Sequence, residues 1–279
     1  MRVLYFTKSA GYEHDIVRHR GGLPSFTEDI LLRLGAAHGI EFVFSKDGSL
    51  FSPEYFAAFD TAMFFTCGDI ASVGDDGQPA VTPEGKQAFL DAVADGLGFL
   101  AVHSAGDTWH TLESGGGNPT YRHHRYRNHG AASDPYIRML GGEFINHGQQ
   151  QTATARITDP QFPGFAGLGE SWRLFEEWYS LKEFAPDLHV LLVLETEGME
   201  GVDYQRPPCP LAWAHPYGKG RVWFNGMGHR EEVWCAPSFQ AMILGGLEWV
   251  GRRVDADITP NLDEAAPGAH IVPPEREGT

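Results

Sequence analysis

The segment "GFLAVHSAGDT" at residues 98–108 passes directly from a run of apolar residues into a group of small and polar ones. A short apolar run next to glycine is typical of a strand buried inside a parallel sheet. Comparable runs predict strands at residues 2–6, 41–45, 61–66 and 97–103. Ser25 has capping-box spacing to Glu28 before one segment of helical period, and Thr82 and Pro83 precede another. This β-α-β-β-α-β order predicts an α/β fold with a mainly parallel sheet and helices on both faces.

The second half of the chain predicts more strands and a closing helix. Strand candidates lie at 152–157, 173–181, 189–195, 211–215 and 221–225, and suggest a partly antiparallel portion of the sheet. A helix is expected over 238–254, just after Pro237. We therefore expect one domain over residues 1–254. The tail at 255–279 has six acidic residues and four prolines, and should lie along the surface or be disordered.

The overall charge limits the classes of partner. The chain has 21 basic and 37 acidic residues, a formal charge of -16, which repels nucleic acid and anionic membrane surfaces. No apolar stretch approaches the length of a membrane span, and the N-terminal apolar run is too short for a signal peptide. Cys67, Cys209 and Cys235 form no CxxC pair, which fits a reducing compartment. We expect a cytoplasmic protein that binds neither nucleic acid nor membrane.

Polar residues follow four of the predicted strands. In open α/β sheets, ligands bind beyond the carboxyl ends of the strands. The clusters cover residues 7–15, 66–69, 103–108 and 226–232. They predict a site that contains His14, Asp15, Asp69, His103, Ser104, Asp107 and His229.

His103 stands at the corner where the apolar run of 98–102 ends. A histidine can act there as acid, base or metal ligand, or can be a core residue bound to backbone. Asp107 could orient this imidazole, bind a sugar hydroxyl or cap the following turn. Ser104 lacks the G-x-S-x-G pattern of a serine hydrolase, so we do not expect it to be a nucleophile.

The stretch "FEEWY" at 175–179 places two carboxylates side by side. On a strand, Glu176 and Glu177 would face opposite sides, so only one could point into the site while the other is a solvated or structural charge. A glutamate packed against aromatic rings would have a raised pKa, which suits a general acid. A plain edge strand explains the pattern equally well.

Evidence for a metal in the sequence is weak. Histidines occur singly at His14, His103, His110, His147, His215 and His229, without an HExxH motif. A site assembled across loops, holding a divalent metal, stays open. The long segment 113–135 is expected to be a lid or binding loop. Its run "RHHRYRNH" at 122–129 could bind metal or phosphate, although a solvated loop face is the favoured interpretation.

Several motifs together resemble the ThuA-like (trehalose utilisation) family over about residues 1 to 252. They are "GYEHD", "GFLAVHSAGDT", "LGGEFINHG", "TATARITDPQFP", "EEWYSL", "LAWAHPYGKGRVWFNGMGH" and "PSFQAMILGGLEW". The resemblance implies a flavodoxin-like three-layer sandwich, as in class I glutamine amidotransferases. In that superfamily the turn after residues 98–102 usually presents a catalytic cysteine. Here it carries His103, so amidotransferase chemistry is not expected.

The resemblance further implies a carbohydrate-processing enzyme, a hydrolase or lyase acting on a 3-keto-glycoside of the trehalose type. We expect His103, His229 and Glu177 to transfer protons. The sugar would be held by His14, Asp15, Asp69, Ser104, Asp107, His147 and Tyr179. Two alternatives stay open: a non-catalytic sugar-binding or regulatory protein, and a metal-dependent hydrolase with a loop-assembled histidine site. Whether the protein forms a homo-oligomer is also left open.

Overall fold

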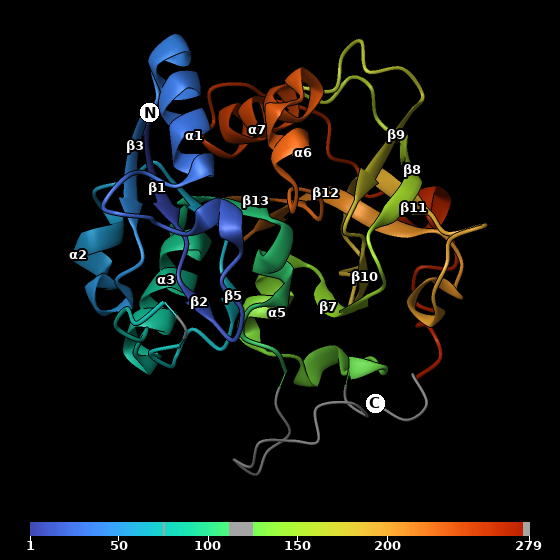
Figure 1. Ribbon diagram of the computed structural model, residues 1–279, viewed down its shortest axis with the longest axis horizontal. Coiled ribbons are helices and arrows are strands. Elements are labelled where there is room, and N and C mark those ends of the chain that lie inside the picture. The colour runs from blue at the N-terminus through green and yellow to red at the C-terminus, as the bar shows by residue number, and fades with distance from the viewer. Residues whose placement is uncertain (75, 112–124, 276–279) are drawn as a thin grey trace.

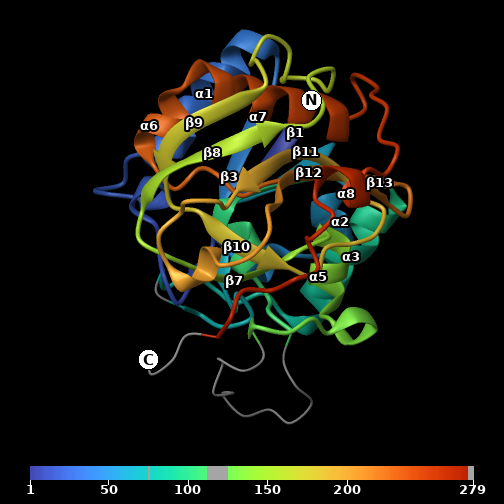
Figure 2. The same cartoon turned by 90° about the vertical axis from the view of Figure 1, so that its right-hand side faces the viewer.

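The computed structural model describes residues 1–74, 76–111 and 125–275, and its centre is a nine-stranded mixed sheet (Figures 1 and 2). The strand order is β3-β1-β4-β6-β13-β12-β11-β8-β9. The parallel side consists of β3 (Glu41–Ser45), β1 (Arg2–Phe6), β4 (Thr61–Phe64), β6 (Gly98–Val102) and β13 (Gly220–Asn225). The antiparallel side adds β12 (Cys209–Tyr217), β11 (His189–Glu195), β8 (Gln151–Ile157) and β9 (Ser171–Glu176).

The fold is α/β, but the prediction of a mainly parallel sheet is wrong. The change of direction occurs at β12 and β13, where Tyr217 pairs with Gly220 across a tight turn. Two strands joined by so short a connection must run antiparallel, because a parallel pair needs a long crossover. Gly218 has a φ of +59° in this turn, a conformation that glycine adopts without strain.

Helices cover both faces of the sheet (Figure 1). One face carries α1 (Phe26–His38) and α7 (Pro237–Val250), with α6 (Glu231–Cys235) beside them. The other carries α2 (Pro53–Phe56), α3 (Pro83–Asp95) and α5 (Pro135–Leu140). Because side chains alternate along a strand, Tyr5 packs on the α1 side and Phe6 on the α3 side.

The predicted helix starts are confirmed. Ser25 and Glu28 form a reciprocal capping box at α1, and the Thr82 side chain accepts a hydrogen bond from the backbone of Gly85 at the start of α3. Short 3-10 helices complete the set: η1 (Asp15–Val17), η2 (Gly48–Leu50), η3 (His103–Asp107), η4 (Gly130–Ala132) and η5 (Val202–Tyr204).

Two small sheets lie near the carboxyl edge of the parallel strands. β2 (Ser9–Ala10) pairs with β5 (Cys67–Gly68), and β7 (Glu143–His147) pairs with β10 (Tyr179–Lys182). The single strand predicted at 173–181 is therefore wrong. The chain leaves the large sheet after Glu176 and enters β10 at Tyr179, in a different sheet.

The described part of the acidic tail runs against the body of the protein. Asn261 exchanges hydrogen bonds with the backbone of Val190, and Arg206 donates to the carbonyl of Ala269 at 2.8 Å. α8 (Leu262–Ala265) ends beside Ala266, which is buried. These backbone contacts hold the segment in place although it has few large apolar residues.

Residues 113–124 of the predicted binding loop at 113–135 lie outside the described residues, which resume at 125. Of the "RHHRYRNH" run, Arg125 donates to the carbonyl of Ile145, and the backbone of His129 donates to Glu183. This part of the run is held on β7 and on the residue that follows β10. Within the described chain, no helix has the length and apolar character needed to cross a membrane.

Candidate active site

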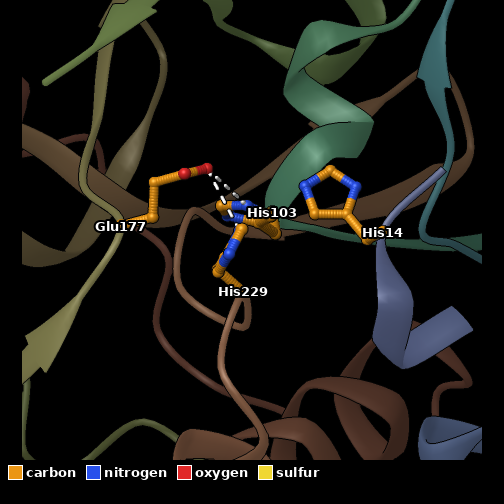
Figure 3. Close-up of side chains that lie close together, drawn as sticks. All are labelled: His14, His103, Glu177 and His229. Carbon is orange, nitrogen blue, oxygen red and sulfur yellow. Dashed lines mark ion pairs between the residues drawn. The ribbon is translucent and has the colours of Figure 1, made fainter. Parts of the chain in front are cut away.

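Four side chains from distant segments meet at the carboxyl edge of the parallel strands (Figure 3). His14 follows β2, His103 follows β6, His229 follows β13, and Glu177 lies between β9 and β10. One ligand atom from each lies within 4.8 Å of the others. All are buried except His229, which is half-buried. The sheet thus brings together four residues predicted separately for the site.

His103 occupies a strained turn. Its φ of 47° is in the left-handed region, which non-glycine residues seldom adopt. The ring Nδ1 lies 2.9 Å from the carbonyl oxygen of Gly226. Because a carbonyl only accepts, Nδ1 must carry the proton, and Nε2 of the neutral ring presents its lone pair to the site. The ring packs on Tyr179 with 4.1 Å between centroids.

Glu177 faces the histidines with both carboxylate oxygens. Its Oε1 lies 3.1 Å from His229 Nδ1 and 3.5 Å from His103 Nε2, and Oε2 lies 3.4 Å from His147 Nδ1. Burial acts to raise the pKa of Glu177, but the close imidazoles of His103 and His229 outweigh it and hold that pKa well below its usual range. The condition for a raised pKa, packing against aromatic rings, is therefore not met at Glu177, because its carboxylate faces imidazole nitrogens.

Glu176, the last residue of β9, accepts hydrogen bonds from the backbone. Its carboxylate accepts the backbone N–H groups of Glu177 at 2.7 Å and of Gly228 at 3.1 Å. It is fully buried, and burial raises its pKa. Glu176 thus ties the segment of Glu177 to the loop that carries His229, a structural role that agrees with one of the two predicted for the second carboxylate.

His14 and His229 also present unpaired nitrogens. Burial holds the pKa of His14 well below its usual value, and the neighbouring imidazoles of His103 and His229 add to this effect, so its ring is neutral near pH 7. His229 Nε2 lies 3.0 Å from the Gln150 amide nitrogen, which donates, so Nδ1 of the neutral ring carries the proton and faces Glu177 at 3.1 Å. A metal at Nδ1 requires this proton to move to Nε2 and the Gln150 amide to turn so that its oxygen accepts it. Among the described residues, His14 Nδ1, His103 Nε2 and His229 Nδ1 are buried without a hydrogen-bond partner.

This arrangement fits a divalent transition-metal ion. Imidazole and carboxylate are ligands that zinc and related metals take in proteins. Ligands at about 2.1 Å from a tetrahedral metal lie roughly 3.4 Å apart. The observed distances of 3.1 and 3.5 Å already match, and the full spread of 4.8 Å needs side-chain shifts of no more than about 1 Å. A metal would also satisfy the three orphaned nitrogens.

The other predicted site residues divide into two groups. His147 and Tyr179 lie beside the cluster, and Ser104 is buried directly after His103, with no partner for its hydroxyl among the described residues. Asp15 and Asp69 are not part of it. Asp15 is exposed and pairs with arginines, while the exposed Asp69 accepts the backbone N–H of Ala71 in a turn.

A second buried network went unpredicted. Asp107 pairs with His110 Nε2 and not with His103, and its other oxygen accepts from the Cys67 thiol at 3.4 Å. His110 Nδ1 donates to Glu143 at 3.0 Å, and Glu143 pairs with Lys182 at 3.3 Å. Burial raises the pKa of the Cys67 thiol, so it is protonated. The spacing of His103 and His110 in the sequence gave no signal of this network, because Glu143 and Lys182 come from other segments.

Comparison with known proteins agrees with this architecture. The family model described as "ThuA: Trehalose utilisation" matches residues 2–250. The chain belongs to the ThuA family. Among the curated proteins, no sequence matches this ThuA family member.

Solved structures support the fold. A ThuA-like protein from Bacteroides uniformis has a TM-score of 0.63 at 16% identity, with 89% of this chain and 90% of that chain covered. A ThuA-like protein from Parabacteroides merdae has a TM-score of 0.57 at 19% identity, with coverage of 99% and 97%. A cytoplasmic protein from Salmonella typhimurium has a TM-score of 0.56 at 13% identity, with coverage of 90% and 99%. At these identities the similarity concerns the fold alone.

Proposed function

We propose that this ThuA family member is a divalent-metal-dependent enzyme that acts on an oxidised carbohydrate such as a 3-keto-glycoside. The observation that carries the proposal is the convergence of His14, His103, His229 and Glu177 at one point. This proposal combines two functions predicted from the sequence. The metal-dependent alternative requires a histidine site, and the residues that form such a site here are those expected to act on the sugar.

The direction of the lone pairs favours a metal over simple acid–base catalysis. Three imidazole nitrogens and a carboxylate oxygen point toward each other in a largely buried space. Unpaired buried nitrogens are costly, and an ion that accepts all the lone pairs removes that cost. The hydrogen bond from His103 Nδ1 to the carbonyl oxygen of Gly226 also fixes the tautomer that metal binding requires, with the lone pair on Nε2.

The chemistry of a keto-glycoside suits this site. A bound divalent metal supplies a Lewis acid that polarises a carbonyl oxygen and stabilises negative charge developing on it. Tyr12 stands 4.8 Å from His14 between ring centroids and is 55% exposed, so its aromatic face is available to a sugar ring. The half-exposed His147, beside Glu177, can bind hydroxyls.

The body is proposed to be flavodoxin-like, as in the class I glutamine amidotransferases. Numbered in chain order, the parallel strands β1, β3, β4, β6 and β13 lie in the order 2-1-3-4-5, which is the order of flavodoxin-like sheets. In such folds ligands bind outside the carboxyl ends of the strands, where the histidines lie.

The test is metal content and metal-dependent turnover of the purified chain. We expect about one divalent transition-metal ion per chain by elemental analysis, and release of reducing sugar from 3-keto-trehalose that stops on chelation and returns with metal. Asp91→Asn, on the exposed face of α3, serves as the control and should match the wild type. Activity that survives complete removal of metal contradicts the proposal. Sugar binding without turnover would favour the non-catalytic alternative.

A further inference from the structure

A buried chain of alternating charges starts at the end of the turn that presents His103. It runs from Asp107 to His110, then to Glu143 and Lys182. Asp107 is the last residue of η3, and His103 is the first. One end of this short helix therefore carries His103, a residue of the proposed metal site. The other end carries Asp107, where the chain of charged side chains starts.

This chain of charged side chains holds several charges inside the protein. His110 has a carboxylate at each ring nitrogen, and Glu143 also accepts the backbone N–H of Thr111 at 3.0 Å. Burial would lower the pKa of His110, but Asp107 and Glu143 raise it to about 9. Buried ion pairs are costly to form, and apolar packing would fill the same space. Such clusters therefore occur often at functional sites.

Along this chain of charged side chains, the exposed fraction of each side chain increases toward Asp107. The side chains of Lys182, Glu143 and His110 are 1%, 3% and 5% exposed, whereas that of Asp107 is 18% exposed. One Asp107 oxygen is held by His110, and the other accepts from the weak Cys67 donor at 3.4 Å. The network thus fixes the position of one carboxylate that is only partly buried.

Asp107 also belongs to the surroundings of the metal cluster. The Tyr179 ring covers His103 with 4.1 Å between ring centroids and packs on Phe144 at 4.2 Å. The Phe144 ring lies 6.3 Å from the ring of His110, which pairs with Asp107. Tyr179 and Phe144 thus connect the His110–Asp107 pair to His103.

We propose that Asp107 is the group that exchanges a proton with the substrate, with His110 as its positioning residue. This inference rests on the proposed function. If His14, His103, His229 and Glu177 bind a metal, their lone pairs are occupied and they cannot act as bases. The site then needs a separate carboxylate or imidazole for proton transfer.

The step balances as an elimination. The Asp107 carboxylate takes the proton from the carbon beside the keto group, and the C–H electron pair forms an enolate. The enolate electrons return to form a carbon–carbon double bond, and the bond to the glycosidic oxygen breaks. The proton passes from Asp107 to the leaving oxygen, which departs as an alcohol. Water later adds to the double bond, so no oxidant or reductant is consumed.

The experiment compares Asp107→Asn and His110→Gln with the surface control Asp91→Asn. Solvent exchange of the substrate C–H proton is followed by NMR in D₂O, together with kcat, KM and bound metal. We expect Asp107→Asn to lower exchange and kcat at least about 100-fold while metal content stays at the wild-type level. His110→Gln should lower kcat less and leave KM unchanged, because the carboxylate stays in the site but loses the neighbour that fixes its orientation.

The outcomes separate the two proposals. Wild-type exchange in a folded Asp107→Asn protein overturns the role of Asp107 and leaves the metal proposal intact. A wild-type protein without metal or turnover overturns both. If Asp107→Asn fails to fold, Asp107→Glu keeps the charge but displaces the carboxylate. That variant should bind metal normally and still lose exchange at least about tenfold, whereas full activity would contradict the proposal.

Discussion

The carbonyl of Gly226 accepts a hydrogen bond from the ring of His103 at 2.9 Å, and this links two of the four cluster residues. Gly226 begins the loop that carries His229, and the strand before it, β13, pairs in parallel with β6, which precedes His103. Asn225 lies opposite Val102 in this register. The orientation of the His103 ring therefore depends on the loop that supplies His229, so both imidazoles are placed by one pair of strands.

Removal of His103 should impair metal binding more than it impairs folding. We expect His103→Ala to weaken zinc binding at least about 100-fold, since one of four ligands is lost. Titration calorimetry of the metal-free protein measures this. His38→Ala, in the exposed last turn of α1, is the matched control and should bind as the wild type does. Equal affinities for the two variants would show that His103 is not a ligand.

Gln150 should tune the metal site without touching the metal. It lies 3.0 Å from His229 Nε2, and its Oε1 accepts from Arg230 at 2.6 Å. Groups that hold the outer nitrogen of a metal-binding histidine are typically worth 10- to 100-fold in affinity. We expect Gln150→Ala to weaken zinc binding by about tenfold. The neighbouring exposed Gln149→Ala is the control, and a Gln150→Ala protein with unchanged affinity would contradict the role.

The charge of His110 should make the free energy of unfolding fall as the pH rises into the alkaline range. The folded pKa of His110 is raised from 6.5 to about 9, so its contribution is complete below pH 6.5 and is lost as the pH rises through about 9. The shift corresponds to about 3 kcal/mol. The lowered pKa of Glu143, to about 2, describes the same contact and is not added.

Denaturant unfolding at pH 7 and pH 10 tests this dependence. The wild type should lose clearly more stability between these values than His110→Gln, in which the titrating group is absent. The comparison cancels other groups that titrate in this range. Parallel losses in the two proteins would mean that the His110 charge does not stabilise the fold.

Much of the fold could be predicted from the sequence because its signals are local. The capping box at Ser25 and Glu28 and the apolar run of 98–102 depend on neighbouring residues alone. The break between Glu176 and Tyr179 could not be predicted. It arises because Glu176 binds the backbone of Gly228, which is far away in the sequence. That contact depends on tertiary packing, which overrides a strand-like pattern.

The candidate site was partly predictable for a related reason. His14, His103 and His229 each follow a parallel strand, and the carboxyl ends of such strands meet at one edge. Asp69 follows this rule as well, yet its side chain turns outward to cap a local turn. The position of a residue after a strand predicts the edge on which it lies, whereas the direction of its side chain depends on local hydrogen bonds. Glu143 follows no such strand and gave no signal.

Gly68 should be required for the contact between β2 and β5 that places Cys67 beside Asp107. A Cβ at this position would lie 1.7 Å from the carbonyl oxygen of Ala10, and φ is +76°. Gly77 also has a positive φ, of +66°, but no atom of the described residues lies within 4 Å of its Cβ position. Gly77→Ala therefore isolates the cost of the backbone conformation, about 1–2 kcal/mol, from the cost of the clash. We expect Gly68→Ala to lose about 3 kcal/mol or more in denaturant unfolding, because backbone atoms of β2 must also move. If the two variants were equally stable, the close approach of β5 to Ala10 would not contribute to the fold.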